Sequence, residues 1–316
     1  MALFKKVEET KTALKVLVYG GTGSGKTVFG LSFPDVVAID SEIGMTHYKN
    51  KYKNLKYILE TTSSSDVEEG LDEVIEMEDI KTFIVDSETK IYENMQHSAL
   101  NLAEKRAKQK GQSVDDANIS QREWGKIKLI TKKLQSAKIM LSSKGVNIVS
   151  IAQEKDIKEK KGDTFVVVGN APDTAKGIEY DYDIVLRFFT EEDKDKNETK
   201  YFAKVLKDRT QKYKKGDIIE NPSFDNWKDI YDNSISKKEE VIDFSKDIDK
   251  DEEKFNIEEK NVEKMVDEFK ELISNISPTN KTLTQAKIKE LGIDIKNLKG
   301  TPADTMTALI DYMKSL

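Results

Sequence analysis

The stretch GGTGSGKT, residues 20–27, lies between the apolar runs VLVY (16–19) and VFGLSF (28–33). It fits the pattern G-x-x-x-x-G-K-[ST], in which glycines let consecutive backbone N–H groups turn inward around phosphates at a helix start. The lysine adds positive charge toward the terminal phosphates, and the last hydroxyl suits Mg²⁺. An ordinary glycine-rich turn is the alternative, which the flanking strand-like and helical runs disfavour. The stretch therefore predicts a nucleotide-binding loop formed by Gly20, Gly21, Thr22, Gly23, Ser24, Gly25, Lys26 and Thr27.

Composition narrows the classes of protein to which the chain can belong. Its 316 residues include no cysteine, which excludes disulfides, thiolate metal sites and cysteine nucleophiles. Only two histidines occur, His47 and His97, so a zinc enzyme is disfavoured. The sequence contains no run of about 18 apolar residues and no charged-then-apolar leader. We therefore expect a cytoplasmic protein with neither a membrane span nor a signal peptide.

Most of the net negative charge lies in one segment. The formal net charge is −6, and residues 231–260 alone contain 11 acidic and 6 basic side chains. Residues 1–230 are consequently close to neutral, so the overall acidity does not exclude a nucleic-acid partner.

Short apolar runs alternate with helical patterns through the first 150 residues. Continuous apolar strands joined by helical crossovers indicate a parallel sheet covered on both faces. The expected strands are KVLVYG (15–20), VVAID (36–40), KYIL (56–59), KTFIVD (81–86) and VNIVSIAQ (146–153), and the expected helices span 25–32, 66–77, 88–110 and 120–142. Beyond residue 153, four further runs follow one another with no long helix, which indicates an antiparallel extension: TFVVVG (164–169), DIVLRFF (183–189), KYFAKVLK (200–207) and DIIE (217–220).

The sequence predicts three parts: an α/β core over residues 1–230, an acidic flexible linker over 231–260 and a small three-helix module over 261–316. The linker segment is highly charged, with isolated apolar residues. We expect the module to begin with Asn261 as an N-cap and to close its second helix, 284–291, with Gly292. Thr301 and Pro302 suit the cap and first residue of the third helix. The first helix carries an apolar stripe of Val262, Met265, Val266, Phe269, Leu272 and Ile273.

Two acidic residues follow strands that neighbour the phosphate-binding loop. Asp86 ends the strand KTFIVD, where it can hold Mg²⁺ together with Thr27; capping the next helix is its alternative role. Glu42 in AIDSE (38–42) lies just beyond the strand that follows the loop's helix. There it can face the terminal phosphate and orient a water molecule.

These residues, in this order, resemble the recombinases of the RecA group. The resemblance spans roughly residues 12–230 and implies a RecA-like P-loop core that uses ATP and Mg²⁺. It also implies that Glu42 polarises the attacking water and that Gln153, at the end of IVSIAQ, senses the terminal phosphate and signals to a DNA-binding loop. A plain polar residue at a strand end is the alternative for Gln153. The segments SFPDVVAIDSEIG and REWGKIK look most like bacteriophage-encoded RecA-like ATPases, including core-only single-strand annealing recombinases, which implies the cytoplasm of a bacterial host.

The segment KVLKDRT (204–210) resembles the Lys-x-Arg finger of RecA-like hexameric helicases. The matching positions are Lys207 and Arg209, and the resemblance implies that they reach the nucleotide of a neighbouring subunit. A homo-oligomer, as a ring or a filament, is therefore expected. A solvated charged turn is the alternative.

Two basic stretches are candidates for contacts with DNA phosphates. EKRAKQKGQ (104–112) can extend a helix beyond the sheet, and EKDIKEKKGD (154–163) directly follows Gln153, where RecA proteins place a DNA-binding loop. A solvated charged face is the alternative for both. The candidate residues are Lys105, Arg106, Lys108, Lys110, Lys155, Lys158, Lys160 and Lys161.

Three functions are compatible with these features. The first is a DNA-dependent ATPase that binds single-stranded DNA and assists phage recombination or annealing, with a single-strand-binding protein or another replication protein as a partner of the C-terminal region. The second is a nucleotide-gated ATPase that remodels a replication or packaging factor without binding DNA. The third is a small-molecule kinase, which four arginines in the whole chain disfavour because such enzymes use several in their lids.

Overall fold

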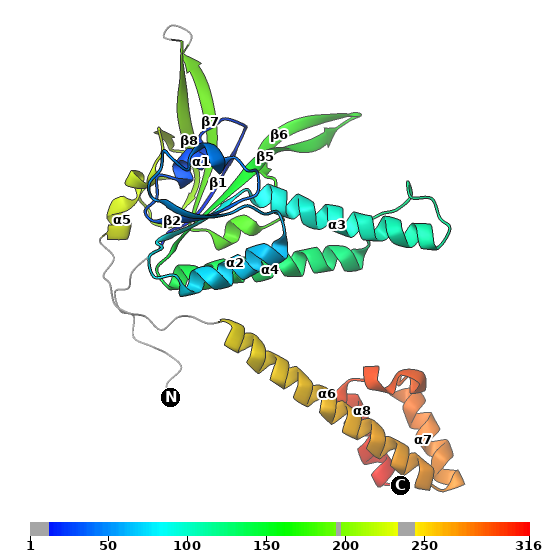
Figure 1. Ribbon diagram of the computed structural model, residues 1–316. Helices are drawn as coiled ribbons and strands as arrows, with labels where there is room; N and C mark the ends of the chain where they lie inside the picture. The colour runs from blue at the N-terminus through cyan, green and yellow to red at the C-terminus, as the bar shows by residue number, and fades with distance from the viewer. Residues whose placement is uncertain (1–12, 194–196, 233–243) are drawn as a thin grey trace. The chain divides into compact units, whose positions relative to one another are not determined.

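The computed structural model describes residues 13–193, 197–232 and 244–316. Contacts within the chain divide it into two compact units, residues 1–242 and 243–316 (Figure 1). The nucleotide-binding loop, residues 20–27, lies in the first unit. Each unit has its own hydrophobic core.

The first unit is built on a nine-stranded sheet with the strand order β3-β2-β4-β5-β1-β7-β8-β9, to which β6 adds by pairing with β5. The strands from β3 to β7 along this order run parallel, and β8 and β9 are antiparallel additions. The bounds are β1 Lys15–Gly20, β2 Val36–Asp40, β3 Leu55–Leu59, β4 Thr82–Asp86, β5 Asn147–Lys161, β6 Thr164–Pro172, β7 Ile184–Asp193, β8 Glu198–Asp208 and β9 Ile218–Glu220. The predicted fold class, a mainly parallel sheet with an antiparallel extension, is confirmed.

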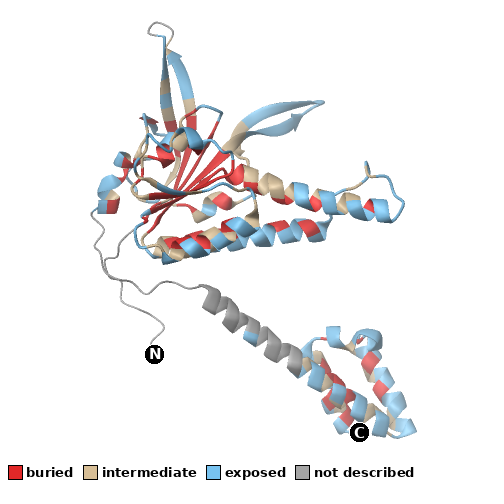
Figure 2. Ribbon diagram, in the orientation of Figure 1, coloured by how far each residue is buried: buried red, intermediate tan, exposed pale blue. Residues whose placement is uncertain are grey.

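Helices cover both faces of the sheet, because side chains alternate along each central strand. In β1, Leu17 and Tyr19 belong to one buried cluster while Val16 and Val18 belong to the other. The first cluster lies under α2, α3 and α4, and the second under α1 and the segment around Trp227, so burial concentrates in the sheet (Figure 2). The bounds are α1 Lys26–Gly30, η1 Met45–His47, α2 Ser64–Glu76, α3 Glu88–Gln109, α4 Gln121–Ser143, η2 Ile178–Asp181, η3 Phe224–Asn226 and α5 Lys228–Asp232.

The segment after Gln153 differs from the expected loop. Strand β5 continues to Lys161 and pairs with β6 in an antiparallel hairpin that projects from the sheet (Figure 1). The physical reason is the run TFVVVG, whose β-branched and aromatic residues favour a strand and give the polar residues after 153 a pairing partner. The distal part of this hairpin is exposed on both strands.

The prediction of a flexible linker over residues 231–260 is wrong for the part that the structure describes as helix. Helix α6 spans Phe244–Asn275, so it includes much of the segment 231–260, and Asn261 lies inside the helix instead of capping it. Residues 244–275 contain neither glycine nor proline and are rich in glutamate and lysine, which favour a continuous helix even when it is highly charged. Residues 233–243 lie outside the described part of the chain.

The rest of the second unit follows the expected three-helix plan. Helix α7, Pro278–Glu290, is followed by Gly292 with a φ of 68°, and α8 spans Ala303–Lys314 after the short helix η4, Ile295–Gly300. The N-cap of α8 is Pro302, whereas the sequence predicted Thr301. The predicted stripe of the first helix packs with Ile288, Ile293, Met306, Leu309, Ile310 and Met313. Across both units, no described helix combines the length and apolar character that crossing a membrane requires.

Candidate nucleotide-binding site

The phosphate-binding loop joins β1 to α1 and needs glycine at two positions for different reasons. A Cβ at Gly20 would lie 2.2 Å from the carbonyl oxygen of Phe188 on the neighbouring strand, so no side chain fits there. Gly25 precedes α1 with a φ of 91°, a left-handed conformation that other residues adopt at a cost. The loop therefore turns tightly enough to direct the first N–H groups of α1 toward a bound phosphate.

Lys26, the first residue of α1, lies over this loop. Its ammonium donates to the carbonyls of Gly20, at 2.9 Å, and Gly21, at 2.7 Å. Burial lowers the pKa of Lys26, while the nearby carboxylates of Asp86 and Glu42 act in the opposite direction. The charge therefore lies where the terminal phosphates of a nucleotide would bind.

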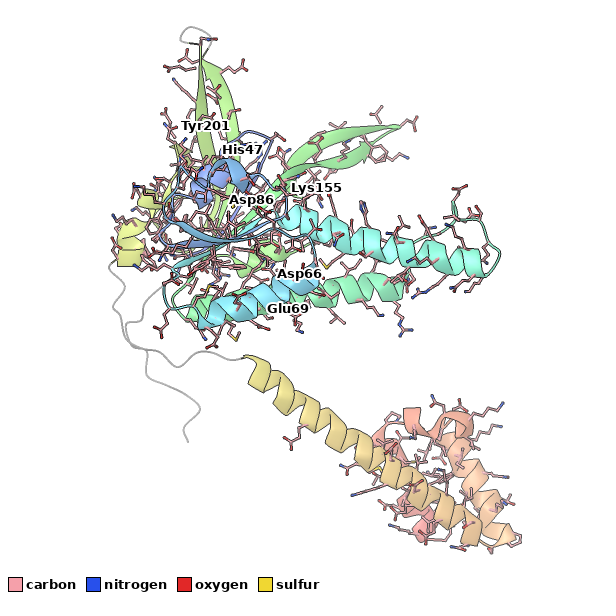
Figure 3. All side chains as sticks on the ribbon, in the orientation of Figure 1. His47, Asp66, Glu69, Asp86, Lys155 and Tyr201 are labelled. Atoms are coloured by element: carbon pink, nitrogen blue, oxygen red, sulfur yellow. The ribbon has the colours of Figure 1, made fainter. Side chains whose placement is uncertain are left out.

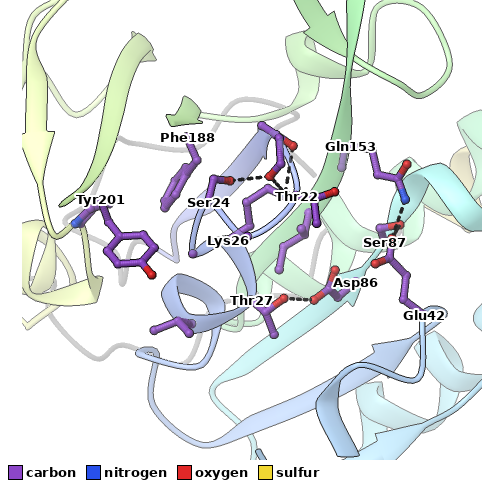
Figure 4. Close-up of a pocket in the computed structure, with 18 of the residues that line it drawn as sticks. Thr22, Ser24, Lys26, Thr27, Glu42, Asp86, Ser87, Gln153, Phe188 and Tyr201 are labelled. Atoms are coloured by element: carbon purple, nitrogen blue, oxygen red, sulfur yellow. Dashed lines mark hydrogen bonds between the residues drawn. The ribbon is translucent and has the colours of Figure 1, made fainter. Parts of the chain in front are cut away.

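Thr27, the second residue of α1, contacts Asp86, the last residue of β4. The Thr27 hydroxyl donates to Oδ2 of Asp86 over 2.6 Å (Figure 4). Burial raises the pKa of Asp86 to about 6, and the charges of Glu42 and Asp40 add to this effect. A buried carboxylate surrounded by acidic groups is stabilised by a cation, so the residues present fit Mg²⁺. Among the described residues no group of three or more acidic or histidine side chains forms a separate metal site, so water and phosphate oxygens would complete the coordination.

Glu42 is held by two side chains from neighbouring strands. Its Oε1 accepts a hydrogen bond from the Ser87 hydroxyl, at 2.7 Å, and one from Nε2 of Gln153, at 2.9 Å (Figure 4). The turn that carries Glu42 is fixed by Asp40, which accepts from the backbone N–H of Glu42 at 3.2 Å and of Met45 at 2.7 Å. The predicted base is thus part of one hydrogen-bonded group with the predicted sensor. Ser87 was not predicted, although its place directly after a strand-terminal aspartate is a usable signal.

Gln153 occupies the root of the β5–β6 hairpin. It pairs in register with Gly20 of the phosphate-binding loop. Its N–H donates to the Thr89 hydroxyl at 2.9 Å, and its carbonyl accepts from the N–H of Asp173 at 2.8 Å. Gln153 therefore touches the Glu42 carboxylate, the start of α3 and the segment that leaves the hairpin.

A cavity of about 710 Å³ contains the loop and extends to a second wall from the antiparallel part of the sheet. Tyr201 of β8 forms part of this wall, 3.3 Å from the position of a Cβ at Gly25 (Figure 4). Tyr48, Tyr52, Asn221 and Pro222 also line the cavity. Sequence reasoning missed Tyr201, Asn221 and Pro222 because the pairing of β8 with β7 and β9, not a local motif, brings them to the loop. It missed Tyr48 and Tyr52 because they follow η1, in a segment that matches no motif. All predicted loop residues, Glu42, Asp86 and Gln153 line this one cavity.

Lys207 and Arg209 do not line the cavity of their own chain. Lys207 donates to the carbonyls of Glu179 and Tyr180, at 3.0 and 3.2 Å, and Arg209 binds Asp183 at 3.1 Å. Lys207 pairs in register with Val185, at the amino end of β7 and away from the phosphate-binding loop. Within one chain, these residues hold the segment that leads into β7.

The eight residues predicted to contact DNA lie on two separate elements. Lys105, Arg106 and Lys108 are exposed near the end of α3, with Lys110 just beyond it, and Arg106 pairs with Glu123 of α4. The remaining four lie on the β5 strand of the hairpin, where Figure 3 shows Lys155 at the base. Lys155 forms an ion pair with Asp173 at 3.0 Å. The four exposed basic residues Lys155, Lys158, Lys160 and Lys161 share residues 154–163 with four acidic ones, so this segment has no net charge.

No curated protein matches the chain. Among solved structures, the flagellar accessory protein FlaH of Methanocaldococcus jannaschii has a TM-score of 0.39 and 11% identity, over 67% of this chain and 85% of its own. A KaiC-like protein of Pyrococcus horikoshii OT3 has a TM-score of 0.38 and 19% identity, over the same shares of 67% and 85%. Both superpositions are too loose to carry an argument about function.

A family described as AAA domain matches residues 12–214. The match covers the phosphate-binding loop, Glu42, Asp86 and Gln153, all of which line the cavity described above. Because the match spans well over half of the 316 residues, it assigns the whole chain to this family. The chain belongs to the AAA domain family of P-loop ATPases.

Proposed function

We propose that the protein is a Mg²⁺-dependent ATPase whose hydrolysis is stimulated by single-stranded DNA, and that it assists homologous recombination or strand annealing. The observation that carries this proposal is the hydrogen bond between Glu42 and Gln153, because Gln153 is also the root of the projecting β5–β6 hairpin. A ligand that moves this part of the chain would change how the catalytic carboxylate is held. The sequence resemblance to phage RecA-like ATPases supports the role in recombination, a phage origin and a place in the bacterial cytoplasm.

Some residues of the site bind ATP, and others act in its hydrolysis. The loop N–H groups and Lys26 bind the phosphates of ATP, and Tyr201 lines the cavity wall beside Gly25. Glu42 accepts a proton from the water that attacks the terminal phosphate, while Ser87 and Gln153 orient its carboxylate. Mg²⁺, held by Thr27 and Asp86, would neutralise phosphate charge.

We further propose that the active site is completed between subunits of a homo-oligomer. The support is that Lys207 and Arg209 lie away from the cavity of their own chain. A basic residue supplied by a neighbour typically contributes about 10³ to 10⁵ in rate. In this scheme, mixing Arg209→Ala with Glu42→Gln subunits restores part of the activity that each variant lacks. A fully active monomer would contradict the scheme. The second unit is our candidate for contacts with a single-strand-binding or other replication protein.

The decisive experiment measures ATP hydrolysis by the full chain with and without single-stranded DNA. We expect stimulation in the wild type, loss of nucleotide binding in Lys26→Ala, and retained binding without turnover in Glu42→Gln. Lys26→Ala fails at binding because phosphate charge loses its partner, whereas Glu42→Gln removes only the base. A wild-type rate that does not respond to DNA would contradict the proposal. Wild-type hydrolysis by Glu42→Gln would contradict the assignment of the base.

A second function, remodelling of a protein partner without DNA, is favoured by one observation. The hairpin exposes consecutive apolar side chains, among them Phe165 at 69% and Val167 at 50%, on a segment whose charges balance. Exposed apolar patches of this kind mark protein contacts more often than nucleic-acid contacts. In that case Phe165→Ser would abolish the ATPase response to a protein partner, and DNA would have no effect on the wild type.

A further inference from the structure

A second cavity, of about 660 Å³, lies on the face of the first unit covered by α3 and α4. Helix α4 forms one wall, and the segment from Ala175 to Asp181, which leaves the hairpin, forms the other. Neither basic stretch predicted to bind DNA contributes to it. We call this cavity the α4 groove.

The side chains that line the α4 groove carry a net positive charge. Lys128, Lys132 and Lys176 line it, and within the described parts of the chain none of the three forms an ion pair. Asp181 is the one acidic residue in the described lining. Helix α4 carries six basic residues, of which Lys133 pairs with Glu68 and the buried Lys138 pairs with Glu88. Its one acidic residue, Glu123, is buried and paired with Arg106. A polyanion would therefore meet a favourable field along this helix.

An exposed aromatic side chain lies on the same face of α4 as two of these lysines. Trp124, Lys128 and Lys132 follow one another at intervals of four residues, which places them on one face of α4. Trp124 is 42% exposed, whereas Trp227, the other tryptophan, is fully buried in the core of the sheet. An exposed indole costs free energy in water, and a base stacked on it would recover part of that cost.

We propose that the α4 groove binds single-stranded nucleic acid, with a base stacked on Trp124 and phosphates contacted by Lys128, Lys132 and Lys176. The proposal rests on the proposed function and gives it a site. Nucleic acid fits better than an acidic peptide because a row of lysines beside an exposed indole matches alternating phosphates and bases. The hairpin, by contrast, offers equal numbers of acidic and basic side chains.

Contacts lead from the groove to the catalytic carboxylate. Gln135 lines the groove, and its Oε1 lies 3.2 Å from the hydroxyl of Tyr182. That hydroxyl is 2.6 Å from the Ser150 hydroxyl, which in turn donates to Glu88. Glu88 is the chain neighbour of Ser87, the residue that donates to Glu42. A nucleic-acid strand bound in the groove would therefore contact one end of a buried chain of hydrogen bonds whose other end lies beside Glu42.

The first test uses the tryptophans as reporters in the full chain. Oligothymidylate should quench the fluorescence of Trp124, since it is exposed, and leave that of buried Trp227 unchanged. Trp124→Phe should keep most of the affinity, measured with labelled oligothymidylate, and lose the quenching. Trp124→Ala should weaken binding about tenfold or more and reduce DNA-stimulated hydrolysis accordingly.

The second test separates phosphate contacts from general charge. Each of Lys128→Ala and Lys132→Ala should reduce the dependence of log affinity on log salt by about 0.7. Lys126→Ala is the matched control, because Lys126 is exposed on α4 without lining the groove, and should keep the wild-type slope. A double variant, Lys158→Ala with Lys160→Ala, should have a smaller effect than either groove variant.

The outcomes distinguish this inference from the function on which it rests. If the wild type does not bind oligothymidylate, the proposed function fails and the inference fails with it. If it binds, but Trp124 is not quenched and Lys126→Ala behaves as the groove variants do, the function stands and the site is wrong. Stronger quenching of Trp124 by polyglutamate than by oligothymidylate would assign the groove to a protein partner and overturn the proposal.

Discussion

The Glu42 carboxylate depends on Ser87 as well as on Gln153 for its orientation. In the proposed mechanism Glu42 is the general base, and removing one of its hydrogen bonds would leave it in place but let it rotate away from the attacking water. We expect Ser87→Ala to lower kcat about tenfold with little change in nucleotide affinity, and Ser87→Thr to recover most of the rate. Steady-state hydrolysis and titration with a fluorescent nucleotide measure the two quantities. A loss of affinity with unchanged kcat would contradict this role.

The buried Asp86 makes stability depend on pH. Its pKa is about 6 in the folded protein against 3.8 for an ordinary aspartate, so between these values the folded state holds more protons than the unfolded state. Stability contributed by this group therefore falls as pH rises from about 4 to 6. Asp86→Asn cannot titrate, so its free energy of unfolding should gain roughly 3 kcal/mol relative to the wild type across this window.

Urea unfolding of both proteins without Mg²⁺ between about pH 4 and 7 tests this expectation, and the difference cancels the other carboxylates. Adding Mg²⁺ at neutral pH should stabilise the wild type more than Asp86→Asn, because the ion pairs with the carboxylate. Parallel pH profiles for the two proteins would show that Asp86 ionises normally.

At the residue scale, the sequence predicts the parts of the site that follow strand ends. Asp86, Glu42 and Gln153 lie on or just after parallel strands, and Lys26 follows β1 through the phosphate-binding loop. The carboxyl ends of parallel strands meet at one edge of the sheet. Tyr201 could not be found this way, because it reaches the loop through the register of an antiparallel pair. Whether Lys207 and Arg209 act in a neighbouring subunit stays a prediction.

At the element scale, the β5–β6 hairpin should be dispensable for the stability of the fold. Its side chains from Lys158 to Val167 are exposed and belong to neither core cluster. Replacing residues 158–167 by a short Asn-Gly turn should change the free energy of unfolding by less than about 1 kcal/mol. Thermal and urea unfolding provide the measurement, with nucleotide binding as a check of the site. A large destabilisation would mean that the hairpin packs on the core.

The two elements that differed from expectation did so for related reasons. Charge and polarity suggested loops at 154–163 and 231–260, but charged residues tolerate regular structure when the backbone has a partner or a good helical propensity. The hairpin obtains its partner from β6, and α6 is continuous because no glycine or proline interrupts it. Charge and polarity alone contain no information on either cause.

At the scale of the whole molecule, the acidic segment 231–260 should weaken binding of single-stranded DNA by the first unit. It carries 11 acidic and 6 basic side chains, so it competes with phosphates for the same lysines. A chain that ends at Asp232 should bind oligothymidylate more tightly than the full chain at low salt, and the difference should shrink as salt rises. Weaker binding by the shorter chain would instead make the second unit a DNA-binding element.

The position of β1 in the sheet has a consequence for how the chain reaches its structure. Val16 pairs with Val149 on one side and with Ile184 on the other, so the first strand can be completed only after most of the first unit has been synthesised. The helices of the second unit, in contrast, contact one another over short stretches of chain. Since non-local pairing slows folding, refolding should show a fast gain of helix followed by a slower burial of Trp227. Until that slow step, the apolar strands remain open to aggregation, and the yield of refolded protein should fall as its concentration rises.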